Sequence, residues 1–313
     1  MTSATPAVSR RPVKRSGGAP RRSPRPLGRR LAPYLFVLPN MLIFGVFTIF
    51  PAVNGFNISL YDSRNGRTFD WVGTRNYERI LADAQFLAVA RNTILFVVAF
   101  VVASTVLAIL FAVLLDAQQR GRSFFRAVLF LPVLLSPVVV GLLWGWLLDR
   151  RTGLVNTLLA AVGLGQPGWL VEPGLALGAV VAVGVWTHLG FYSLILLAGL
   201  QGIDRSLYEA AGLDGATAWQ RFWLITLPLL RPTSLVVLIL ATINGFQAFD
   251  FIYSLTGGGP VGATTLIVQF IYEKAFQSPI RYGLAAAGSV LLFVTVFSAT
   301  LANWLIGRRQ EAV

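Results

Sequence analysis

The chain has 313 residues, of which 55% are hydrophobic and only 12% charged, and its mean hydropathy is +0.68. Soluble domains carry about a quarter charged residues, so this composition indicates an integral membrane protein. The absence of cysteine excludes disulfides, thiolate metal sites and cysteine nucleophiles. The formal net charge of +13 would suggest a nucleic-acid partner in a soluble protein, but here its position along the chain decides its meaning.

The first 30 residues form a basic segment with nine Lys and Arg residues and no acidic residue. The segment is rich in Pro, Ser, Ala and Gly, so it cannot bury a core and is predicted to be disordered. We interpret residues 1–30 as a cytoplasmic tail that lies against anionic lipid, and residues 31–313 as the transmembrane domain. A nucleic-acid-binding arm is the alternative for the tail. The apolar run that follows is too long for a cleavable signal and has no small-residue cleavage site.

Six apolar runs are long enough to cross a bilayer, which takes roughly 20 helical residues. The sequence therefore predicts an all-α integral membrane protein with six transmembrane helices. Prolines inside these runs are tolerated because neighbouring helices and water satisfy the freed carbonyl groups. The predicted spans run from about Tyr34 to Leu60, Asn92 to Leu115, Ala127 to Leu148, Leu175 to Leu200, Thr233 to Leu255, and Tyr282 to Ile306.

The distribution of Lys and Arg predicts that both termini are cytoplasmic. With the N-terminus inside, the inner segments carry 17 of these residues and the outer segments carry nine. Without the basic tail the counts are eight and nine, so the tail decides the orientation. This topology places the polar segment 201–231 in the cytoplasm, between the fourth and fifth spans.

The segment 201–231 is predicted to form two short helices joined by a glycine turn. Ser206 followed by Glu209 has the capping-box spacing, which predicts a helix that starts near Leu207. This helix is expected to end at Gly212 or Gly215, and a second helical piece covers about 216–226. Pro228 and Pro232 then mark the entry to the fifth span. The simplest interpretation is a loop helix lying in the membrane interface.

The same segment resembles the signature loop of ABC importer permease subunits. The match consists of Glu209-Ala210-Ala211, Gly215 after three residues, and Ile225-Thr226-Leu227-Pro228 after nine more. The resemblance implies the type I ABC importer permease fold and a cytoplasmic loop that docks into a groove on a separate ATPase subunit. The residues it assigns to this coupling role are Tyr208, Glu209, Ala210, Ala211, Gly215, Ile225, Leu227 and Pro228.

A second resemblance narrows the class. Residues 249–260 read FDFIYSLTGGGP and are followed by Thr264, Thr265, Tyr272 and Phe276. This stretch is similar to the end of the fifth core span in carbohydrate permeases of the maltose and glycerol-phosphate group. Physically, 256–260 is a glycine-rich turn at the outer side, and it lacks the Gly and Lys spacing of a phosphate-binding loop. The two resemblances together cover about residues 35–307.

The resemblance implies a bacterial plasma-membrane transport subunit that is not an enzyme. Its expected partners are two ATPase subunits that bind the ATP, a second homologous permease, an extracytoplasmic sugar-binding protein and membrane lipid, but not nucleic acid. No cofactor or metal is expected in the chain itself. The alternative is an ion-coupled secondary transporter of a small polar solute that works alone, although no internal repeat is visible. A membrane enzyme lacks a convergent set of acid, base or metal ligands.

Polar residues inside the predicted spans are candidates for the transport path, because such groups are costly in a bilayer. Asn244, Gln247 and Asp250 are spaced three residues apart, which on one helix places them within about a 120° arc. His188 and Tyr192 lie four residues apart on the fourth span. Hydroxyl groups of a sugar need such hydrogen-bonding partners. The alternative is that these side chains join helices to one another through hydrogen bonds.

Overall fold

The computed structural model describes residues 27–117 and 121–311, which form two compact units, 1–52 and 53–313. Most of the predicted tail, residues 1–26, lies outside the described residues. Its last residues belong to helix α1, Leu27–Phe44. Each unit is described by itself.

The first unit contains α1, the π-helical turn η1 (Gly45–Ile49) and the start of α2 (Phe50–Ile58). Residues 34–58 are long and apolar enough to cross a membrane, which confirms the first predicted span apart from its last residues. The wider turn comes just before Pro51, and the Phe50 backbone N–H donates to the Gly45 carbonyl. Proline lacks an N–H and crowds the preceding turn, so a wider turn relieves the helix there.

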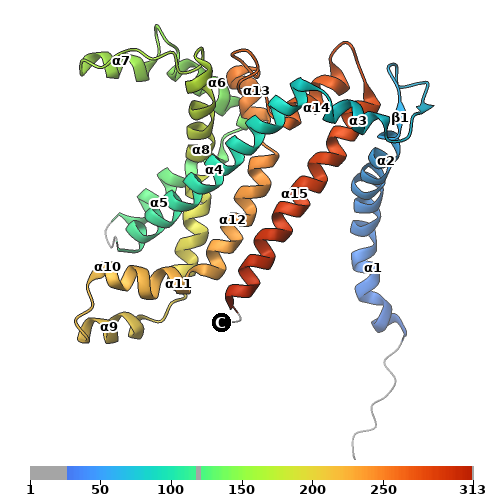
Figure 1. Ribbon diagram of the computed structural model, residues 1–313. Coiled ribbons are helices and arrows are strands. Elements are labelled where there is room, and N and C mark those ends of the chain that lie inside the picture. Colours follow the sequence, from blue (N-terminus) through green and yellow to red (C-terminus); the bar gives the residue numbers. More distant parts are fainter. Residues whose placement is uncertain (1–26, 118–120, 312–313) are drawn as a thin grey trace, which may run out of the picture. The chain divides into compact units, whose positions relative to one another are not determined.

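The second unit is built on two long helices, α4 (Ala84–Ala117) and α8 (Pro173–Gln201), which pack against each other (Figure 1). α12 (Arg231–Phe246) packs on both, and α15 (Tyr282–Glu311) packs on α12. Phe96 and Phe100 of α4 stack with ring centroids 5.7 Å apart and meet Val180, Tyr192 and Leu196 of α8 in the core. α4, α8 and α15 are each long and apolar enough to cross a membrane, at the positions of the second, fourth and sixth predicted spans.

Short elements cover the two ends of this bundle. At the end drawn uppermost in Figure 1 lie the antiparallel strands β1 (Tyr61–Asp62) and β2 (Asp70–Trp71), with helices α3 (Arg75–Leu81), α7 (Leu154–Ala161), α13 (Asp250–Thr256) and α14 (Ile267–Phe276). At the other end lie α9 (Arg205–Leu213) and α10 (Ala218–Arg221).

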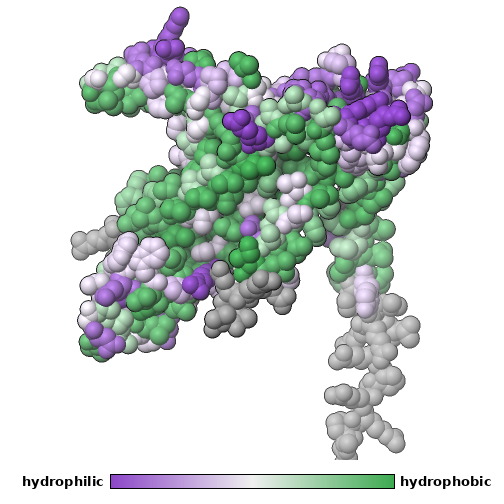
Figure 2. Space-filling view, viewed as in Figure 1, coloured by the Kyte–Doolittle hydropathy of each residue, from purple (hydrophilic) through white to green (hydrophobic). Residues whose placement is uncertain are grey.

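The flanks of the bundle are apolar, whereas its ends are polar. Val98, Val102, Val106 and Leu110, spaced four apart on α4, are all at least half exposed. Figure 2 shows this hydrophobic surface along the helices and hydrophilic residues near the two ends. Such a surface is stable only against lipid or another apolar chain, as expected for a membrane-embedded bundle.

The third predicted span, 127–148, is not one straight helix. It consists of α5 (Arg122–Phe130) continued by a 3₁₀ turn, Leu131–Leu134, and then α6 (Pro137–Leu147), with a bend of 101° between the two parts. Ser136 is extended with ψ 133° because it precedes Pro137, whose ring disfavours helical backbone at the residue before it. The described residues thus contain four helices that could span a membrane, or up to six if each bent pair counts as one span.

The fifth predicted span, 233–255, is also interrupted. α12 ends at Phe246, and a separate helix, α13, starts at Asp250 after Phe249 with φ −148° and ψ −62°. α12 is in addition bent by 67° from the helical segment Ala218–Leu229 that precedes it. α13 packs mainly against α6, so the two broken spans meet at this end of the bundle.

Candidate functional site

The predicted two-helix hairpin is present, but its first cap differs from the prediction. α9 begins at Arg205, and its N-cap is Asp204, whose side chain accepts a hydrogen bond of 2.9 Å from the Ser206 backbone N–H. Ser206 is therefore inside the helix, and the predicted Ser206–Glu209 capping box is wrong. Asp204, the residue directly before α9, takes the cap position because its carboxylate reaches the free N–H groups of the first turn. The same N–H lowers the pKa of the exposed Asp204 carboxyl from its usual value.

Gly215 forms the turn between the two helical pieces, as predicted. Its φ is +77°, in the left-handed region that side chains disfavour. The Ala216 N–H donates to the Ala211 carbonyl at 2.9 Å, and the Gly215 N–H donates to the Gly212 carbonyl at 3.2 Å. These two bonds are the Schellman pattern, which satisfies the last free carbonyls of α9. A Cβ on Gly215 would meet no atom of this chain within 4 Å, so its far side is open.

The second helical piece runs without a break from Ala218 to Leu229, through α10, the π-helical turn η3 (Phe222–Thr226) and α11 (Leu227–Leu229). Thr217 and Gln220 form a reciprocal capping box at its start, which the same spacing rule could have found. Pro228 lies inside this helix rather than at the entry to the fifth span, which starts at Arg231. The wide π turn directly before Pro228 accommodates the proline, as at Pro51.

One side-chain hydrogen bond ties the two pieces of the hairpin together. The Tyr208 hydroxyl of α9 lies 3.0 Å from the Thr226 hydroxyl, which sits in the π turn and is buried. Tyr208, Glu209 and Thr226 also line a cavity of about 1030 Å³ between the hairpin and the ends of α4, α5 and α8. Arg205 and Arg221 lie on the same wall, so Glu209 faces a space with both signs of charge.

The outer surface of the hairpin is unusually apolar for a segment at a polar end. Leu213 is 91% exposed, Leu224 74% and Trp219 69%. Ala210 and Gly212 are also exposed, and they carry only a methyl group and no side chain, respectively. A surface of this kind, rimmed by polar groups, is typical of a docking site for another protein. Of the remaining motif residues, Ile225 and Leu227 are half-buried.

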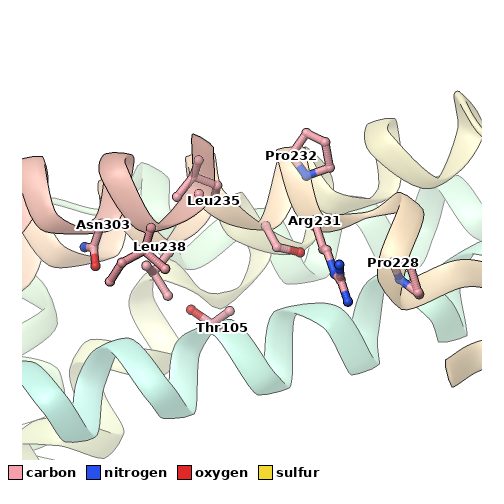
Figure 3. A pocket seen from close by; sticks show the side chains of 10 residues that line it. Thr105, Pro228, Arg231, Pro232, Leu235, Leu238 and Asn303 are labelled. Atoms are coloured by element: carbon pink, nitrogen blue, oxygen red, sulfur yellow. The ribbon is translucent and has the colours of Figure 1, made fainter. Parts of the chain in front are cut away.

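A second pocket lies where the hairpin helix meets the bundle. It has a volume of about 440 Å³ and is lined by α4, α12 and α15 together with Pro228 (Figure 3). In Figure 3 the Arg231 side chain extends from the start of α12 beside Pro228, and Thr105 faces Leu238 across the pocket. Pro228 therefore marks the joint between the hairpin helix and the bent start of α12.

The structure brings three of the predicted path residues together. The Asn244 amide of α12 donates to the Tyr192 hydroxyl of α8 at 2.9 Å. The His188 ring stacks on Tyr192 with centroids 5.8 Å apart, and its Nδ1 lies 3.0 Å from the Gly184 carbonyl. Tyr192 is fully buried, whereas Asn244 and His188 are half-buried.

Gln247 and Asp250 are not on the same helix as Asn244. Gln247 is the exposed C-cap of α12, and Asp250 is exposed at the first turn of α13. The 120° arc expected for a continuous helix therefore does not apply. Between them Phe249 begins a chain of ring contacts, with Tyr253 at 5.3 Å and Tyr272 at 5.2 Å.

The glycine-rich turn after α13 is held by side chains of the motif that follows it. The Thr265 hydroxyl donates to the Gly258 carbonyl at 3.2 Å, and the Gln269 amide donates to the Gly257 carbonyl at 2.9 Å. The Thr256 and Thr264 hydroxyls lie 2.7 Å apart. These contacts give the motif a structural role, namely to fold the turn back onto α14.

Comparison with known proteins identifies the class. The family described as "Binding-protein-dependent transport system inner membrane component" matches residues 104–311, more than half of the chain. The trehalose/maltose transport system permease protein MalF of Thermococcus litoralis is 39% identical over 279 residues, covering 88% of this chain and 93% of that protein. The lactose transport system permease protein LacF of Rhizobium radiobacter is 35% identical over 283 residues, covering 89% of this chain and 94% of that protein.

The fold agrees with the same class. The crystal structure of a bacterial ABC transporter that imports the acidic polysaccharide alginate contains a chain with a TM-score of 0.79 and 26% identity, covering 90% of this chain and 97% of that chain. The chain studied here therefore belongs to the family of binding-protein-dependent transport system inner membrane components, as a multi-pass permease subunit of an ABC importer and not an enzyme.

Proposed function

We propose that this permease imports a carbohydrate which an extracytoplasmic binding protein delivers. The observation that carries the proposal is the hairpin of α9 and α10, whose exposed apolar tip and capped helices suit docking of an ATPase. The sugar class is supported by relatives named for trehalose/maltose and lactose, and by the alginate importer of similar fold. Membership of a binding-protein-dependent family leaves the ion-coupled alternative without support.

The proposed complex contains two ATPase subunits, which bind the ATP, and a second permease that completes the translocation path. The proposed orientation has both termini in the cytoplasm, so that the hairpin faces the ATPases and the end with α13 and α14 faces outward. One solved relative is the alginate transporter in complex with an alginate-bound periplasmic protein, which supports delivery by a binding protein. In this orientation the basic N-terminal segment lies on the side of the anionic inner leaflet.

The hairpin is suited to transmit motion because hydrogen bonds join its two helical pieces. The Schellman turn and the Tyr208–Thr226 contact fix α9 against the helix that leads to Pro228. That helix meets α12 at a 67° bend, so in this proposal a displacement of α9 also displaces the start of α12. Closure of the ATPases on ATP then changes the packing of α12, and the difference in docking free energy between the two states drives the change.

The proposed path runs along α12 and the start of α13. Asn244, Gln247 and Asp250 supply hydrogen-bonding groups at successive depths, with Gln247 and Asp250 exposed in this chain. Tyr192 holds the Asn244 amide through its hydroxyl, and His188 stacks behind Tyr192. A sugar fits such a path because its hydroxyl groups exchange hydrogen bonds with neutral and acidic side chains, and its ring faces stack on aromatic rings.

The first test is co-purification from mild detergent, with and without the change Glu209→Lys. We expect wild-type chain to bring an ATPase with it, and the reversed charge to remove that ATPase, because Glu209 is an exposed acid of the motif and borders the cavity beside the hairpin. The matched control is Asp214→Lys, which reverses the charge of an exposed acid in the same hairpin outside the motif. An isolated wild-type chain that transports on an ion gradient in liposomes would overturn the proposal.

A further inference from the structure

A small polar cavity lies at the end of the bundle opposite the α9–α10 hairpin. It has a volume of about 220 Å³ and is lined by Asp62, Arg64, Asn76, Arg79, Arg281 and Leu284. These residues come from β1, the turn after it, α3 and the start of α15, which lie together in Figure 1. None of them belongs to the coupling hairpin or to the proposed path.

The cavity has an excess of positive charge. Three arginines line it, against one acid, Asp62, which pairs with Arg79 at 3.2 Å. Among the described residues no acidic side chain lies within 4.0 Å of Arg64 or Arg281, and both are exposed. Leu284 belongs to the first turn of α15, whose N-terminus adds a partial positive charge at the same place. The charges favour a bound anion.

One wall of the cavity is held in place by the buried side chain of Asn76. Asn76 is 1% exposed, and its amide nitrogen donates to the Ser59 carbonyl at 2.9 Å and the Tyr61 carbonyl at 2.8 Å. These two bonds fix the orientation of the amide, and its Oδ1 is buried without a hydrogen-bond partner in the described structure. Gly283 lets α15 approach, because a Cβ there would collide with the Tyr61 carbonyl.

We propose that this cavity is the docking point for an acidic side chain of the extracytoplasmic binding protein. Arginine forks bind carboxylates through paired hydrogen bonds, and Arg64 and Arg281 are both exposed to such a group. At about 220 Å³ the cavity is below the size range of small-molecule sites, which argues against a whole oligosaccharide. A lipid phosphate is the other anion that would satisfy the arginines, and its binding is one of the outcomes of the test below.

This inference rests on the proposed function and orientation, which place the cavity on the outer face. The test uses the assembled transporter in nanodiscs of neutral lipid and measures the affinity of its binding protein at low and at physiological salt. The variant carries Arg64→Gln and Arg281→Gln. The matched control carries Arg67→Gln and Arg75→Gln, which removes the same charge from exposed arginines that do not line the cavity.

We expect the Arg64/Arg281 variant to bind about tenfold more weakly at low salt, with a shallower dependence of affinity on salt than wild type. The control should change both quantities much less, and ATP hydrolysis without binding protein should be the same in all three. Equal affinities of the two variants would overturn the inference. The inference would also be overturned if the Arg64/Arg281 variant kept its affinity for the binding protein but lost binding of anionic lipid. If wild-type transporter bound no binding protein, the proposed function itself would fail.

Discussion

At the scale of single residues, a substitution at Gly215 can fail for two different reasons: strain in the backbone of the turn, or obstruction of the ATPase that is proposed to dock there. Gly215 has a φ of +77°, which disfavours any residue with a Cβ, by about 1–2 kcal/mol. The space beyond it is open, so a side chain there would meet only a partner. Asparagine tolerates left-handed backbone better than alanine but has a larger side chain. The two substitutions therefore separate strain in the turn from obstruction of the partner.

We expect Gly215→Asn to reduce uptake more than Gly215→Ala, at equal amounts of protein in the membrane, because in the proposed complex the open side of the turn faces the ATPase. The measurement is sugar uptake by vesicles together with the amount of co-purified ATPase. Gly163→Asn is the control, because Gly163 also has a positive φ, +76°, and open space beyond it but follows α7 at the end of the bundle opposite the hairpin (Figure 1). A larger loss with alanine than with asparagine would show that strain in the turn, and not obstruction, limits transport.

At the scale of helices, the contact between α8 and α12 includes a polar pair. Asn244 of α12 donates to the buried Tyr192 hydroxyl of α8. The pair can either position Asn244 toward a sugar or simply join the two helices. The neighbouring Ser193 donates to the Leu189 carbonyl within α8, so its hydroxyl does not link the helices.

We expect Tyr192→Phe to raise the KM for uptake about two- to tenfold, the effect of losing one hydrogen bond that positions Asn244. Ser193→Ala, which also removes one buried hydroxyl, should leave KM unchanged. The measurement is the concentration dependence of uptake at matched protein levels. If Tyr192→Phe lowered only the amount or thermal stability of the protein, with KM unchanged, the pair would serve helix packing alone.

At the scale of the whole molecule, the bent helix pairs decide how often the chain crosses the membrane. Among the described residues, four helices are long enough to cross the membrane alone. Two bent pairs add a crossing each only if each pair spans the membrane: α5 with α6, and the helix 218–229 with α12. The proposed topology requires the hairpin and the segment between α14 and α15 to face opposite sides. The second unit shows these two segments at opposite ends (Figure 1).

The absence of cysteine makes this topology directly testable, because each introduced thiol is unique. We expect Gln277→Cys to react with a membrane-impermeant maleimide in intact cells, and Leu213→Cys to react only in inside-out vesicles from which the ATPase has been stripped. Both positions are exposed. Val180→Cys, which is fully buried between α4 and α8, should react in neither. Labelling of Gln277→Cys and Leu213→Cys from the same side would contradict the proposed crossings.

The sequence by itself determined the membrane class, the position of the apolar runs and the two-helix hairpin at 205–229. These depend on local properties: hydrophobic length for α4, α8 and α15, and the left-handed preference of Gly215. Only the tertiary structure decided the break at Gln247–Phe249 and the pairing of Tyr192 with Asn244. The reason is that hydropathy measures transfer into lipid, which does not distinguish a straight helix from a bent one. Where a helix bends, and which polar groups meet, is set by packing between segments far apart in the chain.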